Sequence, residues 1–138
     1  MIIGTTRKDV NEAWIDFYSI GHLVLGFVVF FISYWFSLLV LRIQFREYLT
    51  IFTLIFAVLW ELFENICLVK TRFKFDKRKD SVENSLFDIV FVFFGAIICY
   101  IMSLLEAFII IGFLFMIIGV SVMEVCAILT LNSEDHNE

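Results

Sequence analysis

Four long apolar stretches, separated by short polar segments, dominate the pattern of the chain. A helix needs about 20 apolar residues to cross the hydrocarbon core of a bilayer, and each stretch reaches that length. The last two stretches run together from residue 84 to residue 131, with only Glu106 to interrupt them. One helix of that length would span roughly 70 Å, more than twice the membrane core, so we expect a turn at residues 105–107. The pattern predicts membrane spans over residues 17–41, 49–69, 84–105 and 108–131.

The polar segments predict the remaining elements. Residues 6–18 place apolar and charged side chains on opposite sides of a helix. This favours a short amphipathic helix in the membrane interface, although a polar extension of the first span would look similar. Residues 70–83 form a basic loop, in which Asp80 and Glu83 have the spacing of an N-cap and an N3 acid for the third span. Residues 132–138 form an acidic tail.

The composition is that of a membrane protein. Of the 138 residues, 62% are hydrophobic, 18 are Phe and none is Pro. A soluble domain is only about half apolar and needs polar residues for its turns. We expect an all-α integral membrane four-helix bundle that forms a single domain over residues 1–138. Arg7 and Lys8 precede an apolar run that is too long for a cleavable signal, so the first span should be retained.

The basic residues predict the orientation in the membrane. Eight of the ten Lys and Arg residues lie before the first span or between the second and the third, and only Arg42 and Arg46 lie on the opposite side. Positively charged loops stay in the cytoplasm, so both termini should be cytoplasmic, in an inner or plasma membrane. The basic loop makes membrane lipid, and not nucleic acid, the expected partner. The chain could also form a homo-oligomer.

Charged side chains inside the spans are the candidates for function. The second span contains the stretch WELFEN, residues 60–65, in which Glu61 and Glu64 lie one helical turn apart. A charge in hydrocarbon costs about 3 kcal/mol even on lenient scales, so such residues usually face one another or mark a site. In the predicted topology, seven polar residues from all four spans fall in the cytoplasmic half of the membrane: His22, Glu61, Glu64, Asn65, Asn84, Asp88 and Glu124.

These residue types suit a divalent cation. Carboxylate and amide oxygens favour Mg²⁺, Mn²⁺ or Ca²⁺, and a histidine ligand would also admit Zn²⁺. The expected metal ligands are His22, Glu61, Glu64 and Asp88. Glu61, Asp88 and His22 are also the candidate catalytic residues. The expected polar support comes from Asn65, Asn84 and Glu124. No HExxH or EF-hand motif is present in the sequence. A proton or ion relay and a structural network of buried hydrogen bonds remain open as alternatives.

The basic loop beside these acids indicates a substrate class. Six residues are expected to bind lipid phosphate: Lys70, Arg72, Lys74, Lys77, Arg78 and Lys79. A cation can offset phosphoryl charge while a carboxylate moves a proton. We therefore expect the protein to recognise or process a phosphate-bearing lipid or lipid-linked headgroup. The alternatives are a proton or cation channel or transporter, and a non-catalytic accessory or resistance protein. An ordinary cytoplasmic loop would be equally basic.

Three short motifs together resemble the VanZ-like family and related small membrane families with a WE(I/L)xE motif. They are DFYSIGH at residues 16–22, WELFEN at residues 60–65, and DSVENSLFD at residues 80–88 with Gly95 beyond it. The resemblance covers residues 16–96 and implies a bundle of four or five spans. The family is named for glycopeptide resistance, and its chemistry is generally unassigned. The residues that match its polar positions are His22, Glu61, Asp80 and Asn84.

Overall fold

The computed structural model describes residues 2–4, 12–42, 46–71, 79–105 and 108–132. Within these ranges the chain is helical and has no strand beyond one isolated bridge. Short π-helical turns, labelled η, continue two of the helices. The elements are α1 (Phe17–Phe36), η1 (Ser37–Leu41), α2 (Arg46–Phe63), η2 (Glu64–Leu68), α3 (Val69–Thr71), α4 (Val82–Met102) and α5 (Phe108–Asn132). The predicted all-α fold is confirmed.

The helices have the length and surface of membrane spans. Three of them are long and apolar enough to cross a membrane, over Tyr18–Leu41, Arg46–Leu68 and Val82–Met102. In α5 the described apolar stretch is shorter, Phe108–Val122. Large apolar side chains are exposed along the helices, including Leu59 at 59% and Ile117 at 62%. Water would not favour such a surface, but lipid would.

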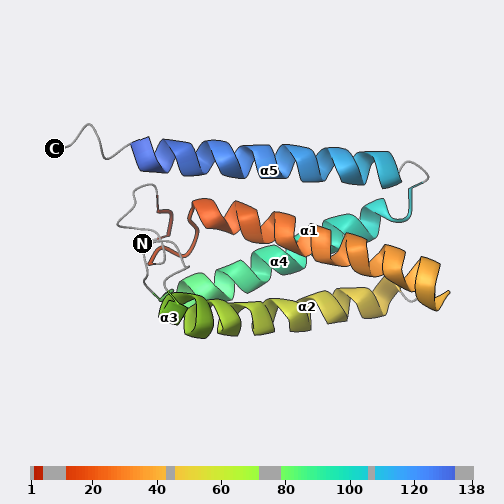
Figure 1. Ribbon diagram of the computed structural model, residues 1–138, viewed down its shortest axis with the longest axis horizontal. Helices are drawn as coiled ribbons and strands as arrows, with labels where there is room; N and C mark the ends of the chain where they lie inside the picture. The colour runs from red at the N-terminus through yellow and green to blue at the C-terminus, as the bar shows by residue number, and fades with distance from the viewer. Residues whose placement is uncertain (1, 5–11, 43–45, 72–78, 106–107, 133–138) are drawn as a thin grey trace.

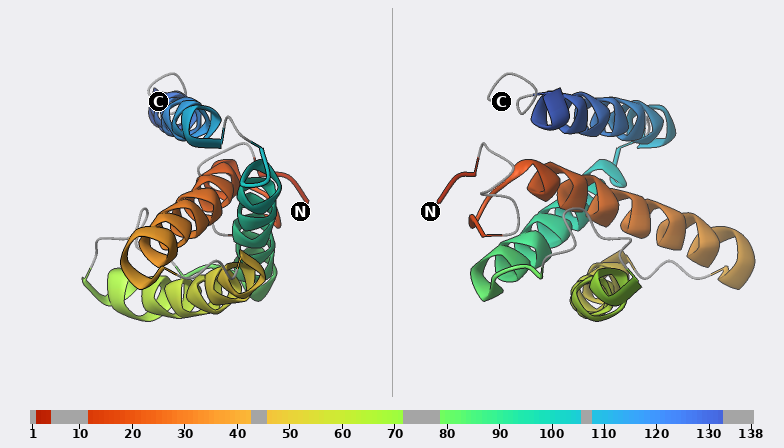
Figure 2. Two further views of the ribbon diagram at one scale, coloured as in Figure 1. Left: turned by 90° about the vertical axis from the view of Figure 1, so that its right-hand side faces the viewer. Right: turned by 60° about the vertical axis from the view of Figure 1, so that its left-hand side comes forward.

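The helices alternate in direction and form layers. α1 and α4 begin at the end of the molecule where α3 and α5 finish (Figure 1). Seen end-on, α1 and α4 form a central pair, α2 lies on one side of the pair and α5 on the other (Figure 2). The four helices are therefore not arranged around one common axis. A site between α1, α2 and α4 excludes α5.

Two glycines allow α1 and α4 to approach closely. A Cβ atom at Gly26 would overlap the carbonyl of Val92, and one at Gly95 would overlap the carbonyl of Leu23. The two helices run in the same direction, so this contact sets which residues of α1 and α4 face each other along their length. Small residues at helix interfaces serve this purpose in membranes, where packing rather than water exclusion drives association.

An aromatic core fills the molecule beyond this contact. Phe27, Phe30 and Phe31 of α1 are buried in one cluster with Ala96, Cys99 and Phe108. α5 contributes less to this core than α4 does, and it approaches α1 where Gly112 meets the Phe31 ring. Among the described residues, the buried side chains beyond this level are thus apolar or aromatic apart from a few hydroxyls such as Ser37 and Ser103, and the buried acids and histidine gather nearer the start of α1.

The segment before α1 differs from the prediction. Residues 12–16 form a turn and a bridge and not a helix, while residues 5–11 lie outside the described ranges. Gly4 N–H donates to the Ile15 carbonyl at 2.8 Å, and Ile15 N–H donates to the Ile2 carbonyl at 2.9 Å. Asp16 then caps α1 by accepting from the backbone N–H groups of Tyr18 and Ser19. The helix prediction for residues 12–16 was wrong because this backbone pairing satisfies their polar groups instead.

Both ends of α4 also differ from the prediction. Its N-cap is Ser81, which accepts from Asn84 N–H at 3.1 Å, and not Asp80. The helix ends at Met102, and residues 103–105 form a turn. Of the predicted basic loop, Lys70 belongs to α3 and residues 72–78 lie outside the described ranges. The same is true of residues 133–138 in the predicted acidic tail.

Candidate functional site

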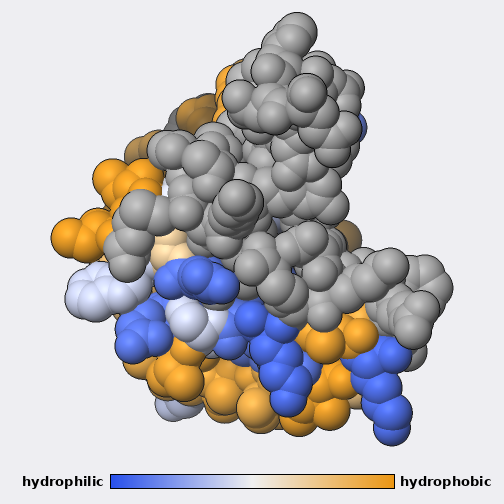
Figure 3. Space-filling view, turned by 90° about the vertical axis from the view of Figure 1, so that its left-hand side faces the viewer, coloured by the Kyte–Doolittle hydropathy of each residue, from blue (hydrophilic) through white to orange (hydrophobic). Residues whose placement is uncertain are grey.

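The titratable residues of three helices converge near the start of α1 and α4. His22 comes from α1, Glu61 from the last turn of α2, Glu64 from η2 and Asp88 from α4. His22, Glu61 and Asp88 are buried and Glu64 is half-buried. Hydrophilic side chains gather on this end of the molecule and apolar ones flank them (Figure 3). The cluster therefore lies inside the bundle, close to its polar end.

The Gly26 and Gly95 contact positions His22 against Asp88. His22 lies one turn before Gly26, and Asp88 lies two turns before Gly95, on the parallel helix. His22 Nδ1 lies 2.9 Å from Asp88 Oδ1, a close ion-pair contact without the direction of a good hydrogen bond. The Ser19 hydroxyl, fully buried on α1, donates to the same Oδ1 at 3.2 Å. Both contacts use one oxygen of the carboxylate.

The other side of the imidazole faces the acids of α2 and η2. His22 Nε2 lies 3.7 Å from Glu61 Oε1 and 3.8 Å from Glu64 Oε2. These distances exceed a hydrogen bond but leave room for a small cation between the atoms. Glu61 Oε1 is buried and has no hydrogen-bond partner among the described residues. A buried carboxylate oxygen without a donor is costly, so this atom is a candidate ligand.

The π-helical turn η2 lies immediately after Glu61. Its backbone hydrogen bonds skip one more residue than those of an α-helix, so one extra residue fits into the turn that carries Glu64 and Asn65. Such turns are frequent at functional sites. The apolar periodicity gave no indication of it, since WELFEN reads as ordinary α-helix.

Asn65 joins this turn to the segment before α4. Its Oδ1 accepts from Asp80 N–H at 2.8 Å, and its Nδ2 donates to the Ser85 hydroxyl at 3.2 Å. Nδ2 also donates to the Glu61 carbonyl at 3.2 Å. Asn65, predicted as polar support, therefore contacts both Glu61 and the segment before α4. Asp80 is brought to the cluster in this way. The sequence had suggested a helix cap for Asp80, and the VanZ-like resemblance a polar position, but neither had suggested a ligand.

Two groups of side chains have the geometry of a cation site. The ligating atoms of His22, Glu61 and Glu64 all lie within 4.8 Å of one another, and so do those of Glu61, Asp80 and Asp88. Donor atoms on opposite sides of Mg²⁺ or Ca²⁺ are about 4.2–5 Å apart, twice the bond length. Either group could hold a metal ion. All four predicted metal ligands are included, and Asp80 is added to them.

The other predicted site residues are not among these ligands. Glu124 is exposed on α5, which lies on the far side of the α1 and α4 pair from α2. The sequence had placed it with the cluster on the assumption that all four spans share one centre. Asn84 is 1% exposed at the start of α4, and its Nδ2 has no hydrogen-bond partner among the described residues. Lys70 and Lys79 are exposed, whereas Arg72, Lys74, Lys77 and Arg78 lie outside the described ranges.

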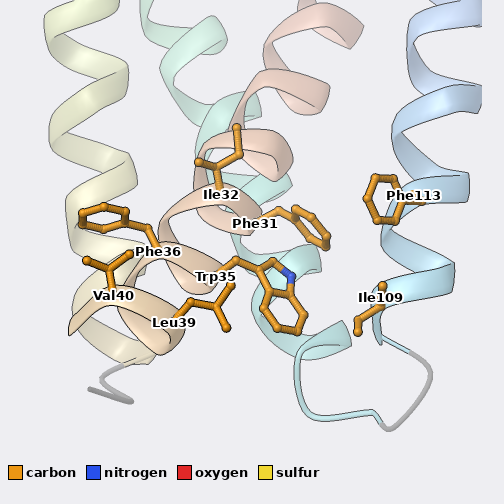
Figure 4. Close-up of a pocket in the computed structure, with 8 residues that line it drawn as sticks. All are labelled: Phe31, Ile32, Trp35, Phe36, Leu39, Val40, Ile109 and Phe113. Carbon is orange, nitrogen blue, oxygen red and sulfur yellow. The ribbon is translucent and has the colours of Figure 1, made fainter. Parts of the chain in front are cut away.

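A hollow lies at the opposite end of the molecule. It has a volume of about 560 Å³ and is formed by the end of α1, by η1 and by the start of α5 (Figure 4). Its lining consists only of apolar and aromatic side chains, such as Trp35, Leu39 and Phe113. Without a titratable or ligating group, this hollow can accept hydrocarbon but offers no chemistry.

The family match covers the whole cluster. Comparisons with curated proteins and with solved structures give no match. A family model described as "Protein of unknown function (DUF2585)" matches residues 4–133, from the segment before α1 to the end of α5. The match does not bear on the resemblance to VanZ-like proteins. The chain belongs to the DUF2585 family.

Proposed function

We propose that the protein binds a divalent cation in the buried cluster of His22, Glu61, Glu64 and Asp88, and uses it to recognise or process a phosphate-bearing lipid headgroup. The observation that carries this proposal is the convergence of His22, Glu61 and Glu64, with their ligating atoms within 4.8 Å of one another. Carboxylates and an imidazole together suit Mg²⁺, Mn²⁺ or Zn²⁺.

The contact between His22 and Asp88 supports a ligand role for the imidazole. A histidine that binds a metal through one nitrogen usually has a carboxylate beside the other, which fixes the orientation of the ring. Here Asp88 lies beside Nδ1, and Nε2 faces the two glutamates. Ser19 holds the same Asp88 oxygen, so the ring and its orienting acid are both positioned before any cation arrives.

The position of the cluster along the bundle supports a lipid headgroup as substrate. It lies near the hydrophilic end of the bundle, where headgroups would meet the protein (Figure 3). A bound cation would offset phosphoryl charge, a carboxylate of the cluster would accept or supply a proton, and the exposed Lys70 and Lys79 would attract the anionic surface. By the distribution of basic residues, this end faces the cytoplasm.

Cation binding by the purified protein tests the first half of the proposal. We expect the protein in lipid nanodiscs to bind Mn²⁺ with at least tenfold higher affinity than the Glu61→Gln variant, as measured by titration with detection of free Mn²⁺ by electron paramagnetic resonance. Glu83→Gln is the matched control, because Glu83 is an exposed acid in the first turn of α4. Equal binding by Glu61→Gln and the wild type would contradict the proposal.

Lipid composition tests the second half. Nanodiscs that contain phosphatidic acid should change the Mn²⁺ affinity or yield a modified lipid by mass spectrometry, and nanodiscs made of a neutral glycolipid without phosphate should not. If Mn²⁺ binds and no phospholipid has either effect, the headgroup assignment is wrong and the cation site remains. If a Glu61→Gln variant kept the full cellular function of the wild type, that result would instead favour an accessory or resistance protein of the VanZ-like kind.

One observation favours a proton or ion relay as the second candidate. Ser19, Asp88, His22 and Glu61 lie in a row inside the bundle, with successive polar atoms 3.2, 2.9 and 3.7 Å apart. Farther along, the buried hydroxyls of Thr53, Ser37 and Ser103 donate to carbonyls of their own helices, and Phe side chains fill the core. A relay across the whole membrane would need polar groups there. Proton flux through proteoliposomes, lost in Asp88→Asn, would support the relay over the headgroup function.

A further inference from the structure

The cluster contains two overlapping groups of ligands. The first consists of His22, Glu61 and Glu64, and the second of Glu61, Asp80 and Asp88, each with its ligating atoms within 4.8 Å of one another. Only Glu61 belongs to both. It comes from the last turn of α2, which lies against both α1 and α4.

We propose that the cluster is a two-cation centre in which the Glu61 carboxylate bridges both ions. This inference rests on the proposed function and extends it from one cation to two. The first ion would lie between His22 Nε2 and the glutamates, and the second between Glu61, Asp80 and Asp88. Paired cations about 3.5–4 Å apart are a common arrangement for binding phosphoryl groups, since both metals can contact the phosphate oxygens.

The state of Glu61 supports a bridging role. Its side chain is 6% exposed, and its Oε1 has no hydrogen-bond partner among the described residues although it points at His22 Nε2. Among the described residues, its other oxygen, Oε2, accepts one long hydrogen bond of 3.4 Å, from Asn65 Nδ2. Both oxygens of the carboxylate are thus available to metal ions.

Asp88 and Asp80 are also arranged for a second ion. Ser19 and His22 both contact Asp88 Oδ1, so the other oxygen is the one a cation would use. Asn65 fixes the backbone of Asp80 through the 2.8 Å hydrogen bond to its N–H. The four positive charges of two divalent ions would also balance the four negative charges of the carboxylates Glu61, Glu64, Asp80 and Asp88. This balance favours two ions inside the bundle over one.

The stoichiometry of Mn²⁺ tests the inference. The full chain in nanodiscs should bind two Mn²⁺ ions per protein, by metal analysis after gel filtration, and the pair should give an exchange-coupled electron paramagnetic resonance spectrum. One bound ion with an isolated-ion spectrum would overturn the two-cation centre and leave the proposed cation function standing. No bound ion would overturn both.

Single substitutions assign each position. Glu64→Gln should remove the first ion and Asp80→Asn the second, each leaving one, whereas Glu61→Gln should weaken both. Glu64 and Asp80 are only half-buried, so these two variants should fold, as circular dichroism and gel filtration can verify. Glu83→Gln, exposed on the same end of α4, should keep two ions. Retention of both ions in Glu64→Gln and in Asp80→Asn would overturn the assignment.

Discussion

At the scale of single residues, Asn65 organises the cluster although it carries no charge. It contacts the backbone of Asp80, the hydroxyl of Ser85 and the carbonyl of Glu61. One amide thereby joins the end of α2 to the start of α4. The acids that it positions are the ones we assign to the cations.

Replacement of Asn65 should therefore affect both stability and cation binding. We expect Asn65→Ala to destabilise the fold by about 1–3 kcal/mol, because partners of its amide lose their hydrogen bonds in a half-buried setting. Mn²⁺ affinity should fall as Asp80 loses its orientation. Thermal unfolding in detergent and Mn²⁺ titration measure the two effects. Ser85→Ala removes only one contact of the amide and should cost less; an equal loss would contradict this explanation.

The sequence predicted four of the five residues in the cluster because an acid or histidine in an apolar run is conspicuous. Asp80 lacked that signal, since it stands in a polar segment where an acid has other uses. Glu124 had the same signal as Glu61 but lies exposed on α5. The cost of a buried charge shows that a residue needs a partner, but the partner depends on helix packing that the pattern does not contain.

At the scale of elements, α1 and α4 form the structural centre of the molecule. Gly26 and Gly95 bring their backbones into contact, and that contact sets His22 opposite Asp88. α2 then supplies Glu61 and Glu64 to a pair that is already in register. The geometry of the cluster therefore depends on the close approach of α1 and α4.

A methyl group at the closest contact should separate the two helices. We expect Gly26→Ala to destabilise the protein by about 1–3 kcal/mol, because the new Cβ would overlap the Val92 carbonyl, which cannot rotate away. Gly119→Ala on α5 is the control, since the three atoms nearest to its Cβ would all belong to the Val24 side chain and not to a backbone. Thermal unfolding compares the two. A greater loss in Gly119→Ala would show that the α1 and α4 contact is not the critical one.

The stretches of chain that form helices were predictable to within a few residues, but the exact residue at which each helix begins or ends was not. A run of apolar residues fixes where a helix must lie in a membrane. The bridge at Ile15, the Ser81 cap and the turn at residues 103–105 depend on individual backbone hydrogen bonds. The turn η2 depends on one extra residue within an uninterrupted helix. None of these changes the hydrophobic pattern.

At the scale of the whole molecule, the layered arrangement separates chemistry from packing. α2 and α5 lie on opposite sides of the α1 and α4 pair (Figure 2). The cluster lies on the α2 side, and the apolar hollow lies against α5 at the other end (Figure 4). When every span is apolar, the sequence pattern does not show which helices are neighbours, so the layers could not be predicted.

The alternating helices predict where reporters fused to the chain should lie. A green fluorescent protein fused after residue 138 should fluoresce, because the end of α5 lies with the start of α1 on the side that the basic residues assign to the cytoplasm (Figure 1). An alkaline phosphatase inserted between α1 and α2 should be active on the opposite side. The reverse result at both sites would invert the orientation and place the cluster at the outer face.

The position of Glu61 also has a consequence for motion. α2 is the least buried of the three long apolar helices, whereas α1 and α4 hold each other through their glycines. Cations bound between α2 and the α1 and α4 pair would hold α2, which has fewer buried contacts, against the two closely packed helices. Amide hydrogen exchange along α2 should therefore slow when Mn²⁺ is added, while exchange in α5, which supplies no ligand, should stay the same.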